Sequence, residues 1–301
     1  MAALACAWLA LTVALLLGHR GGSVRPRDPA TWPAGKPGLV RCFSIEACQK
    51  QVGFSLRKQR PSAGEARWDW TSGPVKGEIR ISIWPTTQEA RQTLSGSMSL
   101  NSFGVKLFAP DGRTLGDVSW TTAGGVLDAQ GKIAWGAHTL IICLCRRNVA
   151  CCLFVRPDHV FSVEESAAAH EELVRVARAI VGALDAVEVV ASPASVECPE
   201  IEVDVGDELR PKMDATIRIA VRRARSPEVA YSCFVTPNSY QGQGGRLPVP
   251  GEVQARIRPT ELGPGVCRVT VTDASGMTRR VEKPVRVVPE RREYWPPRAE
   301  R

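Results

Sequence analysis

Two strongly apolar segments separated by a short polar turn constrain the fold of this chain more than any other feature. They are residues 138–145 (HTLIICLC) and 149–156 (VACCLFVR), with Arg146, Arg147 and Asn148 between them. Each arm has the length of a strand and is apolar along most of its length, which is typical of strands covered on both faces of a sheet. The sequence therefore predicts a buried β-hairpin at the centre of a sheet.

Helix-capping patterns predict the elements around this hairpin. Ser162 and Glu165 form a capping box, so we expect a long helix over residues 163–186. A second box of this kind predicts a shorter helix over residues 87–95. One apolar stripe runs along the long helix, which should therefore cover one face of the sheet. The stripe consists of Leu173, Ala177, Ile180 and Leu184.

A change of pattern divides the chain into two domains. We interpret residues 39–187 as an α+β domain, an antiparallel sheet with a C-terminal packing helix. Residues 188–199, bracketed by prolines, are expected to form a hinge. From residue 200 to residue 289, short alternating segments separated by turn residues predict an all-β sandwich. The charged segment 290–301 is expected to be a flexible tail.

The C-terminal domain contains a more specific pattern at residues 263–276, where a Pro-Gly turn leads into an alternating strand and a D-x-x-G turn. Together with the alternating segment 228–236, this pattern resembles the PKD-like and immunoglobulin-like β-sandwich modules of exported proteins. The resemblance implies a sandwich that serves as a spacer or adhesive unit. Cys267 stands where such modules usually have an aromatic residue, and Cys233 lies near the position of their usual tryptophan.

The N-terminal segment determines the expected location of the protein. Residues 1–18 are apolar and uncharged, and a Pro/Gly-rich linker at 23–38 follows, so we interpret residues 1–22 as a signal peptide or membrane anchor. We therefore expect an exported protein that contacts a membrane only through this segment. No other stretch is long and apolar enough to span a bilayer, which excludes a multi-span transporter or channel.

The net charge of +8 raises the question of nucleic-acid binding. The excess of lysine and arginine is spread thinly along the chain, and no segment concentrates basic residues with interleaved aromatic ones. Binding to a phosphate backbone depends on such clustering. We therefore expect no nucleic-acid partner, and a solvated basic surface accounts for the charge.

Four of the ten cysteines lie in the predicted hairpin, at Cys143, Cys145, Cys151 and Cys152. They are compatible with buried thiols, with one cross-strand disulfide, or with a thiolate site for zinc or Cu(I). Because neighbouring residues of a strand point to opposite faces, at most three of the four can converge. We prefer the interpretation as buried thiols, and the four remain candidate metal ligands.

The other cysteines suggest further disulfides. Cys42 and Cys48 are separated by five residues, and we expect them to close a small disulfide loop. Cys233 and Cys267 both lie on faces that look core-directed, where a buried disulfide and a pair of packed thiols fit equally well. An exported protein permits disulfides but does not require them.

Catalytic motifs are weak in this sequence. His138 opens the hairpin and His159 follows it, so a Cys–His pair with Cys143 is conceivable at one end of the hairpin. The chain contains no HExxH, GxSxG or Walker motif and no GxGxxG after a strand, and we predict no cofactor.

Tryptophan is frequent, with eight residues, and Trp68 and Trp70 precede a Gly-Pro turn. They are candidates for contact with a glycan or peptide, and packing at the ends of the sheet is the alternative. We expect a non-enzymatic binding or structural module of the cell envelope with a protein or glycan partner. An envelope enzyme or a thiolate metal-binding protein that uses the hairpin is the alternative.

Overall fold

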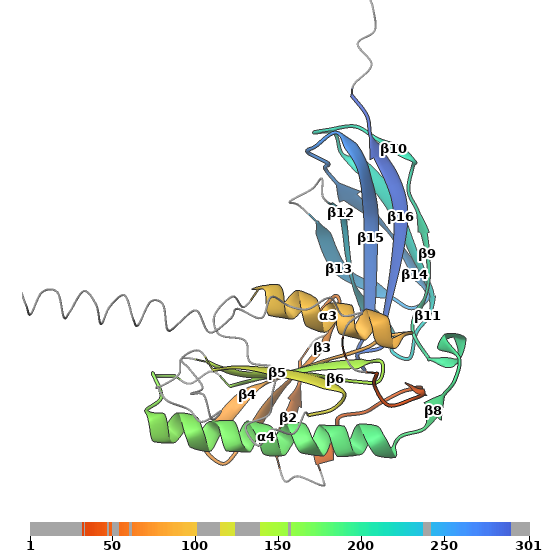
Figure 1. Ribbon diagram of the computed structural model, residues 1–301. Helices are drawn as coiled ribbons and strands as arrows, with labels where there is room; N and C mark the ends of the chain where they lie inside the picture. Colours follow the sequence, from red (N-terminus) through yellow and green to blue (C-terminus); the bar gives the residue numbers. More distant parts are fainter. Residues whose placement is uncertain are drawn as a thin grey trace, which may run out of the picture.

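An antiparallel sheet of six strands forms the centre of the N-terminal domain (Figure 1). The strands are β2 (Ser55–Lys58), β3 (Ala66–Ser72), β4 (Val75–Ile83), β5 (Val118–Ala123), β6 (Leu140–Arg146) and β7 (Val149–Val155). Their order in the sheet is β2-β3-β4-β7-β6-β5. Strands β6 and β7 are the predicted hairpin, and it is central because β4 pairs with β7 and β5 pairs with β6.

The computed structural model describes residues 32, 34–46, 48–49, 54–59, 62–100, 115–123, 139–155, 158–236 and 242–289, with the backbone alone for residues 96–100, 122 and 123. The predicted signal peptide or anchor at 1–22, His138 and the predicted tail at 290–301 lie outside these residues. Within the described ranges, no helix has both the length and the apolar character needed to cross a membrane.

Two helices cover opposite faces of the six-stranded sheet (Figure 1). Helix α4 (Val163–Ala186) begins at the predicted capping box, where the backbone N–H of Glu165 donates to the Ser162 hydroxyl at 3.1 Å. All four residues of its predicted stripe are buried. Helix α3 (Thr87–Leu100) extends beyond the predicted end at residue 95, and its Ala90 and Leu94 pack on the other face.

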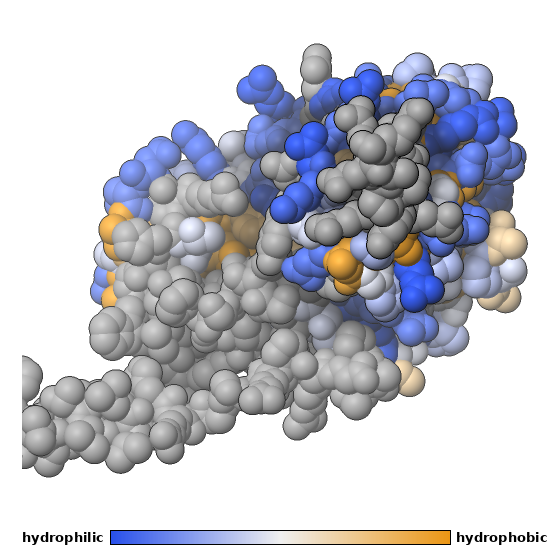
Figure 2. All heavy atoms as spheres, turned by 90° about the horizontal axis from the view of Figure 1, so that it is seen from above, coloured by the Kyte–Doolittle hydropathy of each residue, from blue (hydrophilic) through white to orange (hydrophobic). Residues whose placement is uncertain are grey.

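The C-terminal domain is a β-sandwich of two sheets, with strand orders β10-β16-β15-β12-β13 and β14-β11-β9. All pairs are antiparallel except β10 with β16. Alternate residues of both sheets fill one apolar core, and the described residues on the face seen in Figure 2 are predominantly hydrophilic. The strands are β9 (Glu200–Asp204), β10 (Glu208–Leu209), β11 (Ala215–Arg223), β12 (Glu228–Thr236), β13 (Gln243–Pro248), β14 (Gly251–Ile257), β15 (Gly263–Asp273) and β16 (Thr278–Val287).

The turn between β15 and β16 enters the N-terminal domain. Met277 is fully buried within the core of that domain, and the backbone N–H of Ile83 donates to the Gly276 carbonyl at 2.8 Å. Gly276 has φ of +90°, and a Cβ there would lie 2.8 Å from the carbonyl oxygen of Ile81, so only glycine fits. Asp273 orders the turn by accepting hydrogen bonds from the backbone N–H groups of Ser275 and Met277. This turn thereby anchors the sandwich to the sheet domain.

The segment between the domains is also held in place. Strand β8 (Val189–Val190) pairs with β1 (Leu39–Val40), and a short 3-10 helix, η2 (Pro193–Ser195), follows. Further along, the backbone N–H of Glu197 donates to the Arg41 carbonyl at 3.3 Å. The predicted hinge at 188–199 is therefore pinned to the start of the N-terminal domain, and this contact was not evident from the prolines that bracket it.

Candidate functional site

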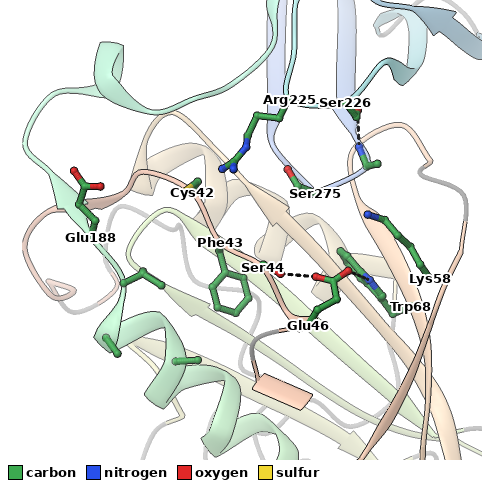
Figure 3. A pocket seen from close by; sticks show the side chains of 14 residues that line it. Cys42, Phe43, Ser44, Glu46, Lys58, Trp68, Glu188, Arg225, Ser226 and Ser275 are labelled. Atoms are coloured by element: carbon green, nitrogen blue, oxygen red, sulfur yellow. Dashed lines mark hydrogen bonds between the residues drawn. The ribbon is translucent and has the colours of Figure 1, made fainter. Parts of the chain in front are cut away.

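A pocket of about 580 Å³ lies where the two domains meet (Figure 3). Its walls come from the chain entering the N-terminal domain, from β2 and β3, from the end of α4, and from two turns of the sandwich. Neither domain forms this pocket alone. The lining residues are Cys42, Phe43, Ser44, Glu46, Lys58, Trp68, Ala183, Ala186, Val187, Glu188, Arg225, Ser226, Ala274 and Ser275.

The part of the pocket beside α4 is apolar. Ala183 and Ala186 lie three residues apart on the last turn of α4, so they share one face of the helix. Val187 ends the helix, and Phe43, whose ring is buried, stands beside them. Small side chains at the helix end leave space that larger residues would fill, and they provide an apolar surface for a ligand.

The opposite side of the pocket is cationic. Arg225 lies between β11 and β12, and its Nη1 is 3.3 Å from Oε2 of Glu197. Glu197 also accepts a hydrogen bond at 2.9 Å from Nε of Arg41. The pKa of Arg225 is raised, and the largest cause is the hydrogen bond between the guanidinium of Arg225 and the thiol of Cys42. These contacts orient the guanidinium, which points from the sandwich toward Cys42 in Figure 3.

An ionised carboxylate, Glu46, occupies the side wall. Partial burial works to raise the pKa of Glu46, but hydrogen bonds from Ser44, its own backbone and Trp68, with the charge of Lys58, outweigh burial and lower it. The Ser44 hydroxyl donates at 2.6 Å and Nε1 of Trp68 at 3.0 Å. The ammonium of Lys58 lies 5.9 Å from the centroid of the Trp68 ring. The pocket therefore presents both signs of charge.

The two tryptophans predicted to contact a ligand are buried, with Trp68 exposed by only 2% and Trp70 by 1%. Trp70 packs edge-on against Phe54 with ring centroids 6.5 Å apart. Trp68 does line the pocket, but Lys58 lies over its ring. Burial therefore favours the alternative of packing within the sheet domain, because both side chains lie on the same buried face of β3.

The hairpin cysteines are divided between two faces of the sheet. Cys143 and Cys152 stand directly opposite each other, with Cα atoms 4.1 Å apart, and form a disulfide. Cys145 lies on the same face, toward α3, and burial raises the pKa of its thiol to about 12. Cys151 faces α4, where burial raises the pKa of its thiol as well. Of the alternatives, a cross-strand disulfide is therefore the one that the structure shows for Cys143 and Cys152.

This division corrects the interpretation of the hairpin as a thiolate metal site. Two of the four sulfurs are bonded to each other and a third lies on the opposite face. The described residues contain no group of three or more histidine, cysteine or acidic side chains placed to hold a metal ion.

The Cys–His pair that the sequence made conceivable is not formed by Cys143 and His159. His159 is 62% exposed at its side chain, and its Nε2 lies 3.4 Å from Glu165. Cys143 has no thiol to activate, because its sulfur is in the disulfide. His138 lies outside the described residues.

The structure also decides the two other cysteine pairs for which the sequence suggested a disulfide. The disulfide predicted between Cys42 and Cys48 is wrong, and both residues are free thiols. Cys42 lies at the pocket, whereas Cys48 is buried in the core of the sheet domain. Burial raises the pKa of Cys48 to about 11. Cys233 and Cys267 are the packed thiols that were one alternative. A hydrogen bond to Cys267, with burial, raises the pKa of Cys233.

The sequence pointed to Trp68 and Cys42 but to few of the other residues that make the pocket. Phe43, Ala186 and Arg225 are far apart in the chain, and none belongs to a motif. The D-x-x-G turn was a further sequence signal, because its Ala274 and Ser275 reach the pocket.

No family model matches this chain, and no curated protein matches it. Among the solved structures that match, two are each similar to 31% of the chain. One is the CARDB domain of the PF1109 protein from Pyrococcus furiosus, with 17% identity, a TM-score of 0.23 and 90% of that chain covered. The other is a cohesin module of a family 33 glycoside hydrolase from Clostridium perfringens, with 10% identity, a TM-score of 0.24 and 99% of that chain covered. No conclusion about function follows from these likenesses.

Proposed function

We propose that this chain is an exported, non-enzymatic binding module that holds its ligand between its two domains. The observation that carries the proposal is the pocket of about 580 Å³, to which both domains contribute. This volume lies in the usual range for small-ligand sites, roughly 300–1,000 Å³, and such sites often occur between domains. The pocket also combines apolar walls with a few charged groups, as ligand sites generally do.

The state of the cysteines favours binding over thiol chemistry. A cysteine nucleophile reacts as the thiolate, whereas burial raises the pKa of Cys145 and of Cys198 to about 12. Both thiols are therefore protonated near neutral pH. These two thiols, one buried and one partly buried, pack and stabilise the fold, and they do not supply a nucleophile.

The cell envelope is the proposed location. The apolar segment at residues 1–18 supports export, and the Cys143–Cys152 disulfide is of a kind that persists in oxidising compartments. The sandwich would serve there in the manner of PKD-like or immunoglobulin-like modules. A protein or glycan partner is proposed rather than a nucleic acid, since surface arginines such as Arg218 and Arg222 are paired with acidic residues.

A substitution that fills the pocket tests this function. Ala186→Trp places a large side chain at the exposed end of α4 inside the pocket, and Ala168→Trp is the matched control on an exposed position of the same helix. Short peptides and oligosaccharides of envelope type are screened by the rise in melting temperature that binding causes. We expect at least one compound to stabilise the unsubstituted protein and the control but not Ala186→Trp. A ligand that stabilises both variants equally, or a panel in which nothing binds, would contradict the proposal.

A further inference from the structure

The two charges of the pocket point to a class of ligand. We propose that the pocket binds a short apolar peptide with both ends free, whose carboxylate pairs with Arg225 and whose ammonium pairs with Glu46. This inference rests on the proposed binding function and makes it specific. The donors left on Arg225, the acceptors left on Glu46 and the apolar surface beside them carry this inference.

Arg225 has donors to spare for a second carboxylate. A guanidinium carries five N–H donors in a planar fork that matches a carboxylate. Glu197, at 3.3 Å, takes one edge of it, and the thiol of Cys42 accepts a further hydrogen bond. The side chain is 43% exposed, so the rest of the fork is accessible to a ligand. Because Glu197 is itself fixed by Arg41, the guanidinium is oriented before the ligand arrives.

Glu46 supplies the complementary charge. Its two oxygens accept hydrogen bonds from Ser44, from Trp68 and from its own backbone, which leaves acceptor capacity for a further donor. Lys58 acts on Glu46 through its longer-range charge, and its ammonium lies over the Trp68 ring. An incoming ammonium would therefore meet an ionised carboxylate that is already held in position.

Apolar side chains of the ligand would lie between these two ends. Figure 3 shows Arg225 entering from the sandwich, with the ring of Phe43 and the carboxylate of Glu46 below it in the sheet domain. Val187 and the two alanines at the end of α4 continue this apolar surface. A bound peptide would thus connect the two domains.

Other ligands fit these groups less well. A fatty acid could pair with Arg225, but its chain would cover the carboxylate of Glu46 without offering an opposite charge, and removing a charge from water in this way is costly. A sugar ring usually stacks on an exposed aromatic face, whereas Trp68 is 2% exposed and lies beneath Lys58. A ligand with two opposite charges and an apolar middle satisfies all three parts of the pocket.

Calorimetric titration of the full chain with tripeptides of alanine, valine, leucine and phenylalanine tests the inference. Each peptide is used with free ends, as the C-terminal amide and as the N-acetyl derivative. We expect the free peptides to bind, and each blocked form to bind about tenfold more weakly or worse, because a charged hydrogen bond is lost. Arg225→Gln should abolish the preference for the free carboxylate, and Glu46→Gln the preference for the free amine. Arg223→Gln, whose side chain is 83% exposed, is the control and should keep both preferences.

The remaining outcomes separate this inference from the proposed function. If octanoate binds as tightly as the peptides and acetylation has no effect, the pocket takes apolar anions and the inference is wrong. If an oligosaccharide binds, Ala186→Trp abolishes that binding and no peptide binds, the inference fails while the proposed function stands. If neither panel binds, both fail. Should Arg225→Gln not fold, Arg225→Lys must weaken peptide binding while leaving the requirement for a free carboxylate, and unchanged binding would overturn the inference.

Discussion

The cysteine hairpin and the domain junction are the two regions where potentially reactive groups gather, and they differ in access to solvent. In the hairpin, Cys143 and Cys152 are bonded to each other and Cys145 is fully buried. At the junction, Arg225 and Glu46 are oriented by neighbours yet partly exposed at a pocket. The hairpin belongs to the interior, where its groups stabilise the sheet, and the junction is where a ligand can reach the protein. Density of reactive residues in the sequence is therefore a poor guide to the site.

Removing the Met277 side chain, which anchors the sandwich to the sheet domain, should have the largest effect on stability. Met277→Ala deletes a fully buried side chain that joins the sandwich to the core of the sheet domain, and we expect it to lower the free energy of unfolding by about 2–5 kcal/mol. Urea unfolding followed by tryptophan fluorescence measures the change. Met213→Ala is the control, because Met213 is 50% exposed and its loss should cost less than about 0.5 kcal/mol. Equal effects of the two substitutions would show that the turn does not hold the domains together.

The next effect belongs to the hairpin. The disulfide closes a loop with a sequence separation of 9, and reducing it should lower the free energy of unfolding by about 2–3 kcal/mol. The measurement is urea unfolding with and without dithiothreitol. The double variant Cys143→Ala/Cys152→Ala should no longer respond to the reductant, whereas Cys233→Ala/Cys267→Ala should respond as the unsubstituted protein does. A response that persists in the first double variant would place the disulfide elsewhere.

Register explains why the two cysteine pairs differ. Cys143 and Cys152 are direct partners of an antiparallel ladder, whereas Cys233 pairs with Val269 and Cys267 with Val235. Diagonal neighbours of this kind have Cα atoms roughly 7–8 Å apart, at or beyond the reach of a disulfide. The diagonal pair therefore remains as thiols, and the opposite pair is oxidised.

The local elements could be predicted because their signals are local. The box of Ser162 and Glu165 located the start of α4, and the apolar arms located the hairpin. The sequence could not decide which cysteine lies opposite Cys143, because that depends on the length of the turn. The sequence suggested a turn of three residues, whereas the structure has two, Arg147 and Asn148, and this register places Cys152 opposite Cys143. The φ of +53° at Arg147 is unusual for a residue with a side chain, and nothing in the sequence announces it.

The candidate site could not be predicted for a different reason. Its charged groups, Glu46 and Arg225, are almost 180 positions apart, and ordinary residues surround each of them. They line one pocket only because Met277 anchors the sandwich to the sheet domain. A site that depends on the docking of two domains leaves no periodic or motif-like pattern in either one.

A smaller, pH-dependent effect links the two regions. Arg146, at the end of β6, donates two hydrogen bonds to Asp185 near the end of α4, at 2.8 and 2.6 Å, and this lowers the pKa of Asp185 from its ordinary value of 3.8. A depressed pKa in the folded state stabilises the protein above the unfolded pKa, and that stability is lost as the pH falls through the folded one. Asp185→Asn should cost about 1 kcal/mol at pH 7, since the pair is partly exposed.

Unfolding in urea at pH 7 and at steps below pH 4 measures this effect. The difference between Asp185→Asn and the unsubstituted protein should shrink as the pH falls. Asp214→Asn, which removes an exposed partner of Arg258, is the control and should change stability much less. A difference that stays constant with pH would mean that the carboxylate charge of Asp185 does not stabilise this contact.

The central claim is that the reactive side chains accessible to solvent lie at the domain junction, whereas the cysteines of the hairpin only stabilise the fold. Alkylation of the folded protein with iodoacetamide, mapped by mass spectrometry over time, tests it most directly. We predict that Cys42, which lines the pocket, is modified well before Cys145 and Cys151, and that Cys143 and Cys152 react only after reduction. Modification of Cys145 or Cys151 as fast as Cys42 in the folded protein would contradict the claim.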